Sequence, residues 1–270
     1  MFDYHVHTTR SADCDTPIEE SCKAAIAAGI TEIAFTDHVE HELADMSYGY
    51  YDYHGFMEDV SRVRERFGDR LTILAGAEVD FNTRIRDEVG EWLDTHPGYD
   101  FIIGSCHYGD NGEIIFPEYF DHRSVQQVFE AYYVQLIAAA ETGWFDTLGH
   151  IDLPKRYAPP AAGDYDPLAC EDLLRQLFSV LIEKNRSFEI NTSGLRQAPK
   201  TSMPAGQIVG LYTSMGGKLM TIGSDSHFAH HIGNGFEETL AMLQLCGITE
   251  LSSFRQRNRT QVPIASLLKK

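Results

Sequence analysis

The fold is decided by the succession of Phe2-Asp3-Tyr4-His5-Val6-His7, a helical stretch, and Ile30-Thr31-Glu32-Ile33-Ala34-Phe35-Thr36. Two short, largely apolar stretches separated by a helical pattern are typical of a strand–helix–strand unit with parallel strands. The alternation continues along the chain, with strand candidates at Phe2–His7, Ile30–Thr36, Leu71–Glu78, Asp100–Cys106, Phe145–Gly149, Ser187–Asn191 and Lys218–Gly223. These roughly seven strands predict an α/β fold in which strand–helix units surround a parallel sheet or a barrel.

Two of the intervening helices have clear signals. The first has Thr16 and Glu19 as a predicted capping box and Gly29 as its stop. The second covers Arg123–Thr142, where apolar residues recur at helical spacing. No interior linker interrupts the alternation, so we expect one domain over residues 1–270, although the length alone also permits two small domains.

The composition argues against several classes of partner and site. The formal net charge is −18, from 22 basic and 40 acidic residues, which disfavours binding to nucleic acid or to anionic membrane surfaces. Five cysteines without a C-x-x-C pair argue against a disulfide framework or a thiolate zinc site, so a reducing compartment is expected. The first residues lack the features of a signal peptide, and no apolar stretch approaches the roughly 18 residues of a membrane span. We therefore expect a cytoplasmic protein.

Polar functional groups follow every predicted strand. They are His5 and His7, Asp37 and His38, Glu78 and Asp80, His107, His150 and Asp152, Arg196, and Asp225 and His227. In barrels and open α/β sheets the carboxyl ends of the strands meet at one mouth, so these groups are expected to converge. Imidazoles and carboxylates without cysteine form a ligand set suited to zinc, manganese or iron. There are more ligands than one ion needs, so a site for two to three divalent ions is predicted.

The spacing of the candidate ligands has a geometric reason. His5 and His7 are two residues apart on a strand, so both project to the same face and can reach one ion, while Val6 packs the other way. Glu78 has two oxygens and can bridge two ions about 3.5–4 Å apart, an arrangement that holds a phosphoryl group beside a hydroxide. A single His-x-His is weak evidence, because histidines are also frequent in cores and at strand ends. The metal-site interpretation depends on the whole set.

Three segments without clear periodicity are predicted to form loops over the site: His41–His54, Asp110–His122 and Lys155–Asp166. The acids and tyrosines of residues 40–53 belong either to an irregular solvated loop or to a lid for a cationic, ring-containing substrate. Arg156 and Arg196 are either ordinary surface cations or bidentate donors to a phosphate at the mouth. Four histidines without ligand spacing are expected at the surface: His41, His54, His96 and His122.

These elements resemble the PHP (polymerase and histidinol phosphatase) phosphoesterases and, within that family, the histidinol-phosphate phosphatases. The motifs that carry the resemblance span nearly the whole chain: His5-Val6-His7-Thr8 with Ser11-Ala12-Asp13, Phe35-Thr36-Asp37-His38, Gly76-Ala77-Glu78, Gly104-Ser105-Cys106-His107, Gly149-His150-Ile151-Asp152, Glu189-Ile190-Asn191-Thr192-Ser193-Gly194 and Gly223-Ser224-Asp225-Ser226-His227. The resemblance implies a distorted, TIM-like (β/α)7 barrel with three metals at the carboxyl ends of its strands.

The family pattern also implies which residues hold each ion. The three implied sets are His5, His7, Glu78 and Asp225; Glu78, His107 and His150; and His38 with His227. Asp13 stands where several members have a histidine, and it is a further candidate ligand. The segments Leu153-Pro154-Lys155-Arg156, Ser193-Gly194-Leu195-Arg196 and His231-Ile232-Gly233 resemble the phosphate-binding elements of the histidinol-phosphate phosphatases.

The implied activity is hydrolysis of L-histidinol phosphate to L-histidinol and inorganic phosphate in histidine biosynthesis, with a metal-bridging hydroxide as nucleophile. Arg156, Arg196 and His231 are the predicted phosphate ligands, and Asp225 or His231 is the predicted proton carrier. Two alternatives are a broader phosphoesterase acting on other small phosphomonoesters or nucleotides, and a metal-stabilised module without catalysis. The acidic net charge weighs against long nucleic acid as substrate. The sequence leaves the oligomeric state open.

Overall fold

The computed structural model describes residues 1–160 and 165–268. Within them, seven parallel strands follow one another in the order β1-β2-β4-β5-β6-β7-β8, and β3 pairs with β4 beyond the end of β2. The bounds are β1 (Phe2–Val6), β2 (Glu32–Phe35), β3 (His38–Val39), β4 (Thr72–Asp80), β5 (Phe101–Ser105), β6 (Thr147–Leu148), β7 (Ser187–Asn191) and β8 (Met220–Gly223). Val6 forms a parallel bridge with Ser226, just after β8, so the sheet curves into a nearly closed barrel. The predicted α/β barrel is confirmed.

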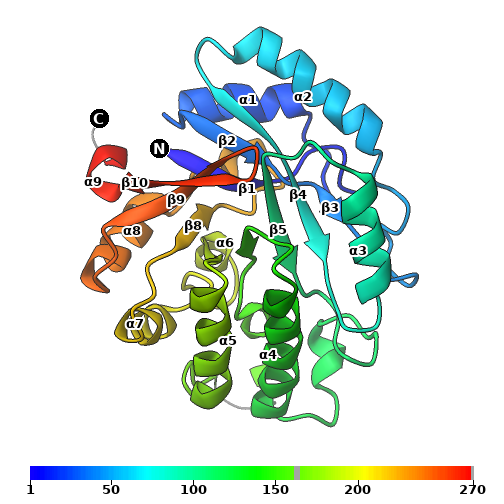
Figure 1. Ribbon diagram of the computed structural model, residues 1–270, viewed down its shortest axis with the longest axis vertical. Coiled ribbons are helices and arrows are strands. Elements are labelled where there is room, and N and C mark those ends of the chain that lie inside the picture. The colour runs from blue at the N-terminus through cyan, green and yellow to red at the C-terminus, as the bar shows by residue number, and fades with distance from the viewer. Residues whose placement is uncertain (161–164, 269–270) are drawn as a thin grey trace.

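Helices lie around the outside of this barrel (Figure 1). The α-helices are α1 (Ile18–Ala27), α2 (Tyr53–Phe67), α3 (Arg86–Thr95), α4 (Val125–Thr142), α5 (Glu171–Glu183), α6 (Ser193–Arg196), α7 (Gly206–Ser214), α8 (Phe236–Leu245) and α9 (Ile264–Leu267), and the short 3-10 helices are η1 (Pro117–Phe120), η2 (Leu153–Arg156) and η4 (Ala229–His231). The longer helices bury one apolar stripe against the strands, as Leu174, Leu177 and Leu181 do on α5.

The predicted strands are all present, and the helix ends agree less well. β7 has both of its predicted ends, whereas β6 is shorter than predicted. The capping box predicted at Thr16 is wrong: α1 begins after Pro17 without a side-chain cap, and the Thr16 hydroxyl donates to the carbonyl oxygen of His227 at 2.9 Å. That hydrogen bond ties the start of α1 to the loop after β8. A capping box does begin α4, where Ser124 and Gln127 bond reciprocally.

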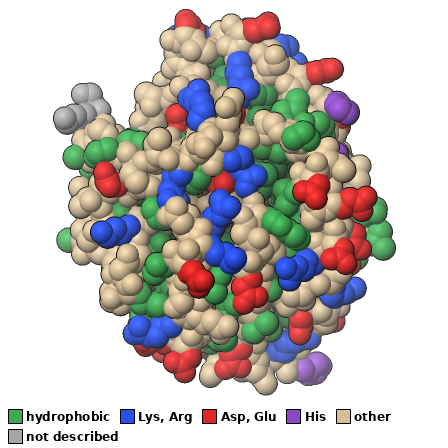
Figure 2. All heavy atoms as spheres, in the orientation of Figure 1, with side chains coloured by type: hydrophobic (Ala, Val, Ile, Leu, Met, Phe, Trp, Pro, Cys, Tyr) green, Lys and Arg blue, Asp and Glu red, His purple; other side chains and the backbone are tan. Residues whose placement is uncertain are grey.

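A β-hairpin that the sequence did not predict lies at the amino ends of β5 and β6. Its strands are β9 (Glu250–Arg255) and β10 (Asn258–Pro263), and they pair antiparallel. Asp100, just before β5, accepts the backbone N–H groups of Gln256 and Arg257 at the turn, at 3.0 and 2.9 Å. The side chain of Arg257 also pairs with Asp146, just before β6. Figure 2 shows this face of the molecule, on which Lys and Arg side chains gather toward the middle.

Two expectations from composition can be compared with the structure. All five cysteines are free thiols in the structure: Cys14, Cys22, Cys106, Cys170 and Cys246. In the described part of the chain, no helix has the length and apolar character needed to cross a membrane. The cytoplasmic location and the single domain over residues 1–270 stay predictions.

Candidate functional site

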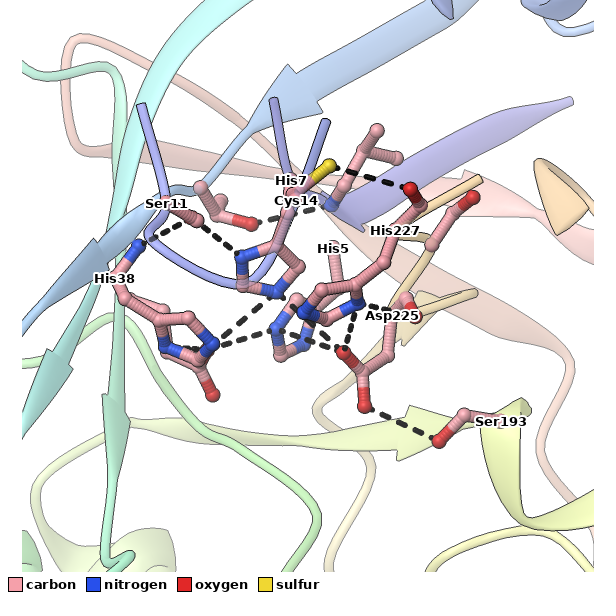
Figure 3. A network of polar contacts seen from close by, with 12 residues as sticks. His5, His7, Ser11, Cys14, His38, Ser193, Asp225 and His227 are labelled. Atoms are coloured by element: carbon pink, nitrogen blue, oxygen red, sulfur yellow. Dashed lines mark hydrogen bonds and ion pairs between the residues drawn. The ribbon is translucent and has the colours of Figure 1, made fainter. Parts of the chain in front are cut away.

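Side chains at the carboxyl ends of β1 and β4 and in the loop after β8 meet at the carboxyl end of the barrel. The Nε2 atoms of His5 and His7 lie 3.2 and 3.6 Å from Oε2 of Glu78, and Nε2 of His7 lies 3.4 Å from Oδ1 of Asp225. Asp225 has a φ of 51°, in the left-handed region that Asp tolerates better than most residues. Figure 3 shows the imidazoles of His5 and His7 directed toward its carboxylate. The structure therefore brings together the first predicted ligand set.

The second predicted set gathers around the other oxygen of Glu78. Nε2 of His150 lies 2.9 Å from Oε1 of Glu78, and Nε2 of His107 lies 3.5 Å from the same atom. Glu78 is 1% exposed and stands between the two groups of histidines. This is the position that a bridging carboxylate would occupy.

The third set is His38 and His227, and the structure adds Asp13 to it. Oδ2 of Asp13 lies 3.1 Å from Nε2 of His227 and 3.6 Å from Nε2 of His38. The His7 ring stacks on the His227 ring, with centroids 4.1 Å apart. Asp13 is thus placed where a ligand is needed, although its side chain is 45% exposed.

Several buried polar atoms in this cluster have no hydrogen-bond partner among the described residues. They include Nε2 of His5, Nε2 of His7, Nδ1 of His38 and Oε2 of Glu78. A buried polar atom without a partner is unfavourable, so these atoms fit ligands of cations. Potential ligand atoms lie within 4.8 Å of one another in four groups: His7, His38 and His227; His5, His7 and Asp225; His38, Glu78 and His107; and Glu40, Asp80 and His107. The donor set therefore fits more than one divalent ion.

The electrostatics of the cluster also favour cations. Burial alone would lower the pKa of His5, but the charges of Glu189, Glu78 and Asp225 outweigh it and raise that pKa well above its ordinary range. Burial and the neighbouring histidines His227 and His38 lower the pKa of His7 to about 3, so its imidazole stays neutral. The carboxylates thus create a negative field that positive charge must offset, and a metal ion supplies that charge while leaving the imidazoles neutral.

Three of the ligand candidates are held from behind by residues that were not predicted as ligands. Nδ1 of His5 lies 2.7 Å from Oε1 of Glu189, and Nδ1 of His107 lies 3.0 Å from Oε1 of Glu40. Nδ1 of His7 lies 3.0 Å from the hydroxyl of Ser11. A buried Glu in the apolar strand β7 was the one available signal for Glu189. Its partner could not be deduced without the closure of the barrel.

The two predicted phosphate-binding arginines occupy different places. Nη2 of Arg156 donates to Oγ of Ser193 at 2.6 Å and to Oδ2 of Asp225 at 2.8 Å, and the residue lines the cavity described below. Nη2 of Arg196 donates to the carbonyl oxygen of Ser224 at 2.7 Å. Nη1 of Arg196 is buried without a hydrogen-bond partner among the described residues. Arg156 thus faces the mouth directly, whereas Arg196 lies behind the loop that carries Asp225.

Like Arg196, His231 is a predicted phosphate ligand that does not line the cavity among the described residues. It lies in η4, its ring centroid is 4.2 Å from that of His230, and it is not one of the described residues that line the cavity. Burial and the charge of Arg196 lower its pKa. A role for His231 in binding phosphate or in proton transfer stays a prediction.

A cavity of about 720 Å³ opens above the cluster. Its floor, as we call it, consists of residues at or just after strand ends together with one loop residue and one arginine: His38, Glu78, His107, His150, Asp225, His227, Asp13 and Arg156. Its wall, as we call it, consists of loop residues, chiefly Glu40, residues 44–47, Tyr108, residues 112–116, Glu118, Tyr119 and Tyr157. Two of the three predicted loops, His41–His54 and Asp110–His122, therefore do lie over the site. Residues 161–164 of the third, Lys155–Asp166, lie outside the described residues.

The wall is acidic and aromatic, in contrast to the one arginine of the floor. Glu40, Asp45, Glu113 and Glu118 contribute carboxylates to it, and Arg156 is the only Lys or Arg among the described residues that line the cavity. Tyrosine and phenylalanine side chains lie between these acids. Among the described residues, the cavity therefore offers one positive side chain, Arg156, beside the cluster and several carboxylates in the wall.

Comparison with known proteins agrees with this geometry. The PHP domain family matches residues 3–193. The chain is 26% identical over 254 residues to a histidinol-phosphatase of Lactococcus lactis, covering 93% of each chain. It is 29% identical over 246 residues to a probable histidinol-phosphatase of Thermotoga maritima, covering 90% of this chain and 91% of the relative. The crystal structure of the Lactococcus lactis histidinol phosphate phosphatase, complexed with zinc, L-histidinol and phosphate, superposes with a TM-score of 0.85 at 23% identity, covering 96% of this chain and 98% of that one.

Proposed function

This chain belongs to the PHP domain family as a metal-dependent phosphatase, and on that premise we propose that its substrate is L-histidinol phosphate. The observation that carries the proposal is the polarity of the cavity. Arg156 lies beside the histidine–carboxylate cluster at the floor, and the carboxylates of Glu40, Asp45 and Glu118 line the wall. A phosphate at the floor and a cationic leaving group at the wall would each meet the opposite charge. Aromatic wall residues would also stack on an imidazole ring.

The relatives support the same substrate. Both named proteins are described as histidinol-phosphatases or probable ones, and the similarity covers about nine-tenths of this chain. The zinc-containing structure of the Lactococcus lactis enzyme holds L-histidinol and phosphate, the two products of this reaction. We therefore extend the activity of these relatives to this chain as a proposal.

In the proposed reaction, three sets of residues would hold two to three divalent ions. The sets are His5, His7, Glu78 and Asp225; Glu78, His107 and His150; and Asp13, His38 and His227. Bound ions of this kind lower the pKa of water and offset charge on phosphoryl oxygens. The physiological ion is zinc, manganese or iron in this proposal, and zinc is the ion present in the relative.

The chain's own residues bind and orient the substrate. The guanidinium of Arg156, held by Ser193 and Asp225, would donate to the phosphate in a fixed orientation. Arg196 fixes the carbonyl of Ser224 and so supports the loop that carries Asp225. For the proton transfer, Asp225 lines the cavity and His231 does not, so we assign the proton carrier to Asp225.

The deciding experiment is a comparison of substrates with metal analysis on the same preparation. We expect kcat/KM for L-histidinol phosphate to exceed that for glycerol phosphate and a dinucleotide by about 100-fold or more, because the two latter leaving groups lack the cation. Similar values for all small phosphomonoesters would instead identify a broader phosphatase, which the size of the cavity permits. Metal binding without release of phosphate would identify a module without catalysis.

A further inference from the structure

Glu189 is a buried carboxylate beneath the histidine cluster that the proposed reaction does not use. It lies on β7 and is 1% exposed. Its Oε1 atom is 2.7 Å from Nδ1 of His5, at the end of β1. Its Oε2 atom accepts the backbone N–H of His150 and the side-chain amide of Asn191, both at 3.0 Å. One carboxylate therefore contacts candidate ligands of two other strands.

The neighbouring strand leaves room for this contact. Gly223, the last residue of β8, lies next to Asn191 of β7 in the register of the two strands. A Cβ atom on Gly223 would overlap both Oε1 of Glu189 and Cβ of His5. Only glycine at this position lets Glu189 reach across to His5 without displacement. The contact between Glu189 and His5 thus depends on glycine at position 223.

In the part of the chain that the structure describes, no arginine or lysine pairs with Glu189. Among the described residues, its one ion-pair partner is His5. A buried carboxylate without a cationic partner is unfavourable, so a neutral residue here would be expected if its role were packing alone. The hydrogen bonds that Glu189 accepts from His150 and Asn191 satisfy its second oxygen. The first oxygen is available to His5.

We propose that Glu189 is a positioning residue that fixes the tautomer of His5. Because a carboxylate only accepts, the hydrogen bond requires the proton on Nδ1 of His5, and the lone pair is then on Nε2. Nε2 is the atom that faces Glu78 and Asp225, at 3.2 and 3.8 Å, and it has no hydrogen-bond partner within residues 1–160 and 165–268. Glu189 would thereby keep His5 in the tautomer whose Nε2 atom can bind a cation. Its other oxygen would at the same time hold the backbone of His150.

The proposal rests on the proposed function only in that the cluster binds metal. It does not depend on the identity of the substrate. A failure of the substrate comparison above would leave it intact, whereas a chain that binds no zinc under any condition would contradict the metal-dependent function itself.

The test is Glu189→Gln, which keeps the shape of the side chain. If the Gln oxygen accepts from His5, its amide group faces the N–H of His150, and two donors meet. If the amide is reversed, it donates to Nδ1 of His5 and selects the wrong tautomer. We expect zinc affinity, measured by competition with a chromophoric chelator, to fall about 10- to 100-fold. Excess zinc should restore most of kcat.

Glu32→Gln is the matched control. Glu32 is a partly buried carboxylate on β2 that bonds to Tyr4 and, at 3.0 Å, to Ser253, away from the candidate ligands. It should lower the melting temperature without changing zinc affinity. If Glu189→Gln behaves in the same way, with unchanged zinc affinity, Glu189 is only structural and the proposal is wrong.

A second measurement does not require a variant to fold. In the zinc-loaded natural protein, the ¹⁵N chemical shifts of the His5 ring should show a protonated Nδ1 and a metal-bound Nε2. The opposite assignment, with zinc on Nδ1 of His5, would contradict the proposal directly.

Discussion

The floor and the wall of the cavity differ in how firmly their residues are held. On the floor, Glu78 is 1% exposed, and five histidines have a ring nitrogen within 3.6 Å of its carboxylate oxygens. On the wall, Met46 is 76% exposed and Glu118 is an exposed residue with no ion pair among the described residues. Most floor residues lie at or just after strand ends, whereas the wall residues lie in loops and in η1.

This difference separates the chemistry of the site from its specificity. Residues at strand ends are fixed by the sheet register and by their hydrogen bonds, so metal binding depends on the fold itself. Loop residues can change without altering the barrel, and loops commonly determine which substrate an α/β barrel accepts. We therefore expect floor variants to abolish activity on every substrate and wall variants to change the preference among substrates.

The largest effect should come from Glu78→Gln on the floor. Both oxygens of Glu78 face histidines, and the variant loses the charge with which it would bridge two ions. We expect kcat/KM to fall about 1000-fold or more for all substrates, with loss of bound metal. Metal analysis and phosphate release on one preparation measure both. Full metal occupancy with normal turnover would show that Glu78 is not the bridge.

Arg156→Ala should have the next largest effect. The variant removes the only arginine or lysine among the described residues that line the cavity. Because the guanidinium would bind the phosphoryl group, we expect kcat/KM to fall about 100-fold while metal content stays near that of the natural protein. Arg156→Lys is the control, since an ammonium keeps the charge without the bidentate geometry. Recovery of full activity in the Lys variant would reduce the role of Arg156 to its charge.

The floor was predictable because its residues follow from strand positions. The alternation of apolar stretches located all seven strands of the barrel, and parallel strands must present their carboxyl ends together. His5 and Asp225, 220 positions apart in the sequence, could therefore be placed at one mouth before the structure was known. The capping box predicted at Thr16 is wrong, because the hydroxyl of Thr16 donates to the carbonyl oxygen of His227 instead.

Other features could not be predicted because they depend on contacts across the barrel. The turn between β9 and β10 has positive φ values of 49° at Gln256 and 64° at Arg257, and neither residue is a turn signal such as Asn-Gly. Asp100 holds this turn by accepting both backbone N–H groups. The pairing of Glu189 with His5 is of the same kind, because β7 and β1 are not neighbours in the sheet. Such contacts become visible only when the barrel is closed.

Arg196→Ala tests whether Arg196 supports the loop that carries Asp225 or binds the phosphate. Arg196 bonds to the carbonyl oxygen of Ser224, and its buried Nη1 atom has no hydrogen-bond partner among the described residues, so its loss should loosen the loop that carries Asp225. We expect bound metal and kcat to fall about 10-fold, while KM for L-histidinol phosphate changes little. A rise in KM with metal content intact would show that Arg196 binds the phosphate rather than supporting the ligands.

The smallest and most selective effect is expected from Glu118→Gln on the wall. Glu118 lines the cavity and is exposed, so solvent screens its attraction for a cationic leaving group. We expect KM for L-histidinol phosphate to rise about 3-fold, while KM for glycerol phosphate, whose leaving group is neutral, stays the same.

The control for this variant is Glu20→Gln, an exposed residue of α1 that does not line the cavity and should change neither KM. Raising the ionic strength should reduce the difference between the natural protein and Glu118→Gln, because salt screens exposed charges. An equal rise in KM for both substrates would mean that Glu118 shapes the entrance without recognising charge. In that case buried Glu40 would be the next wall carboxylate to test for recognition of a cationic leaving group.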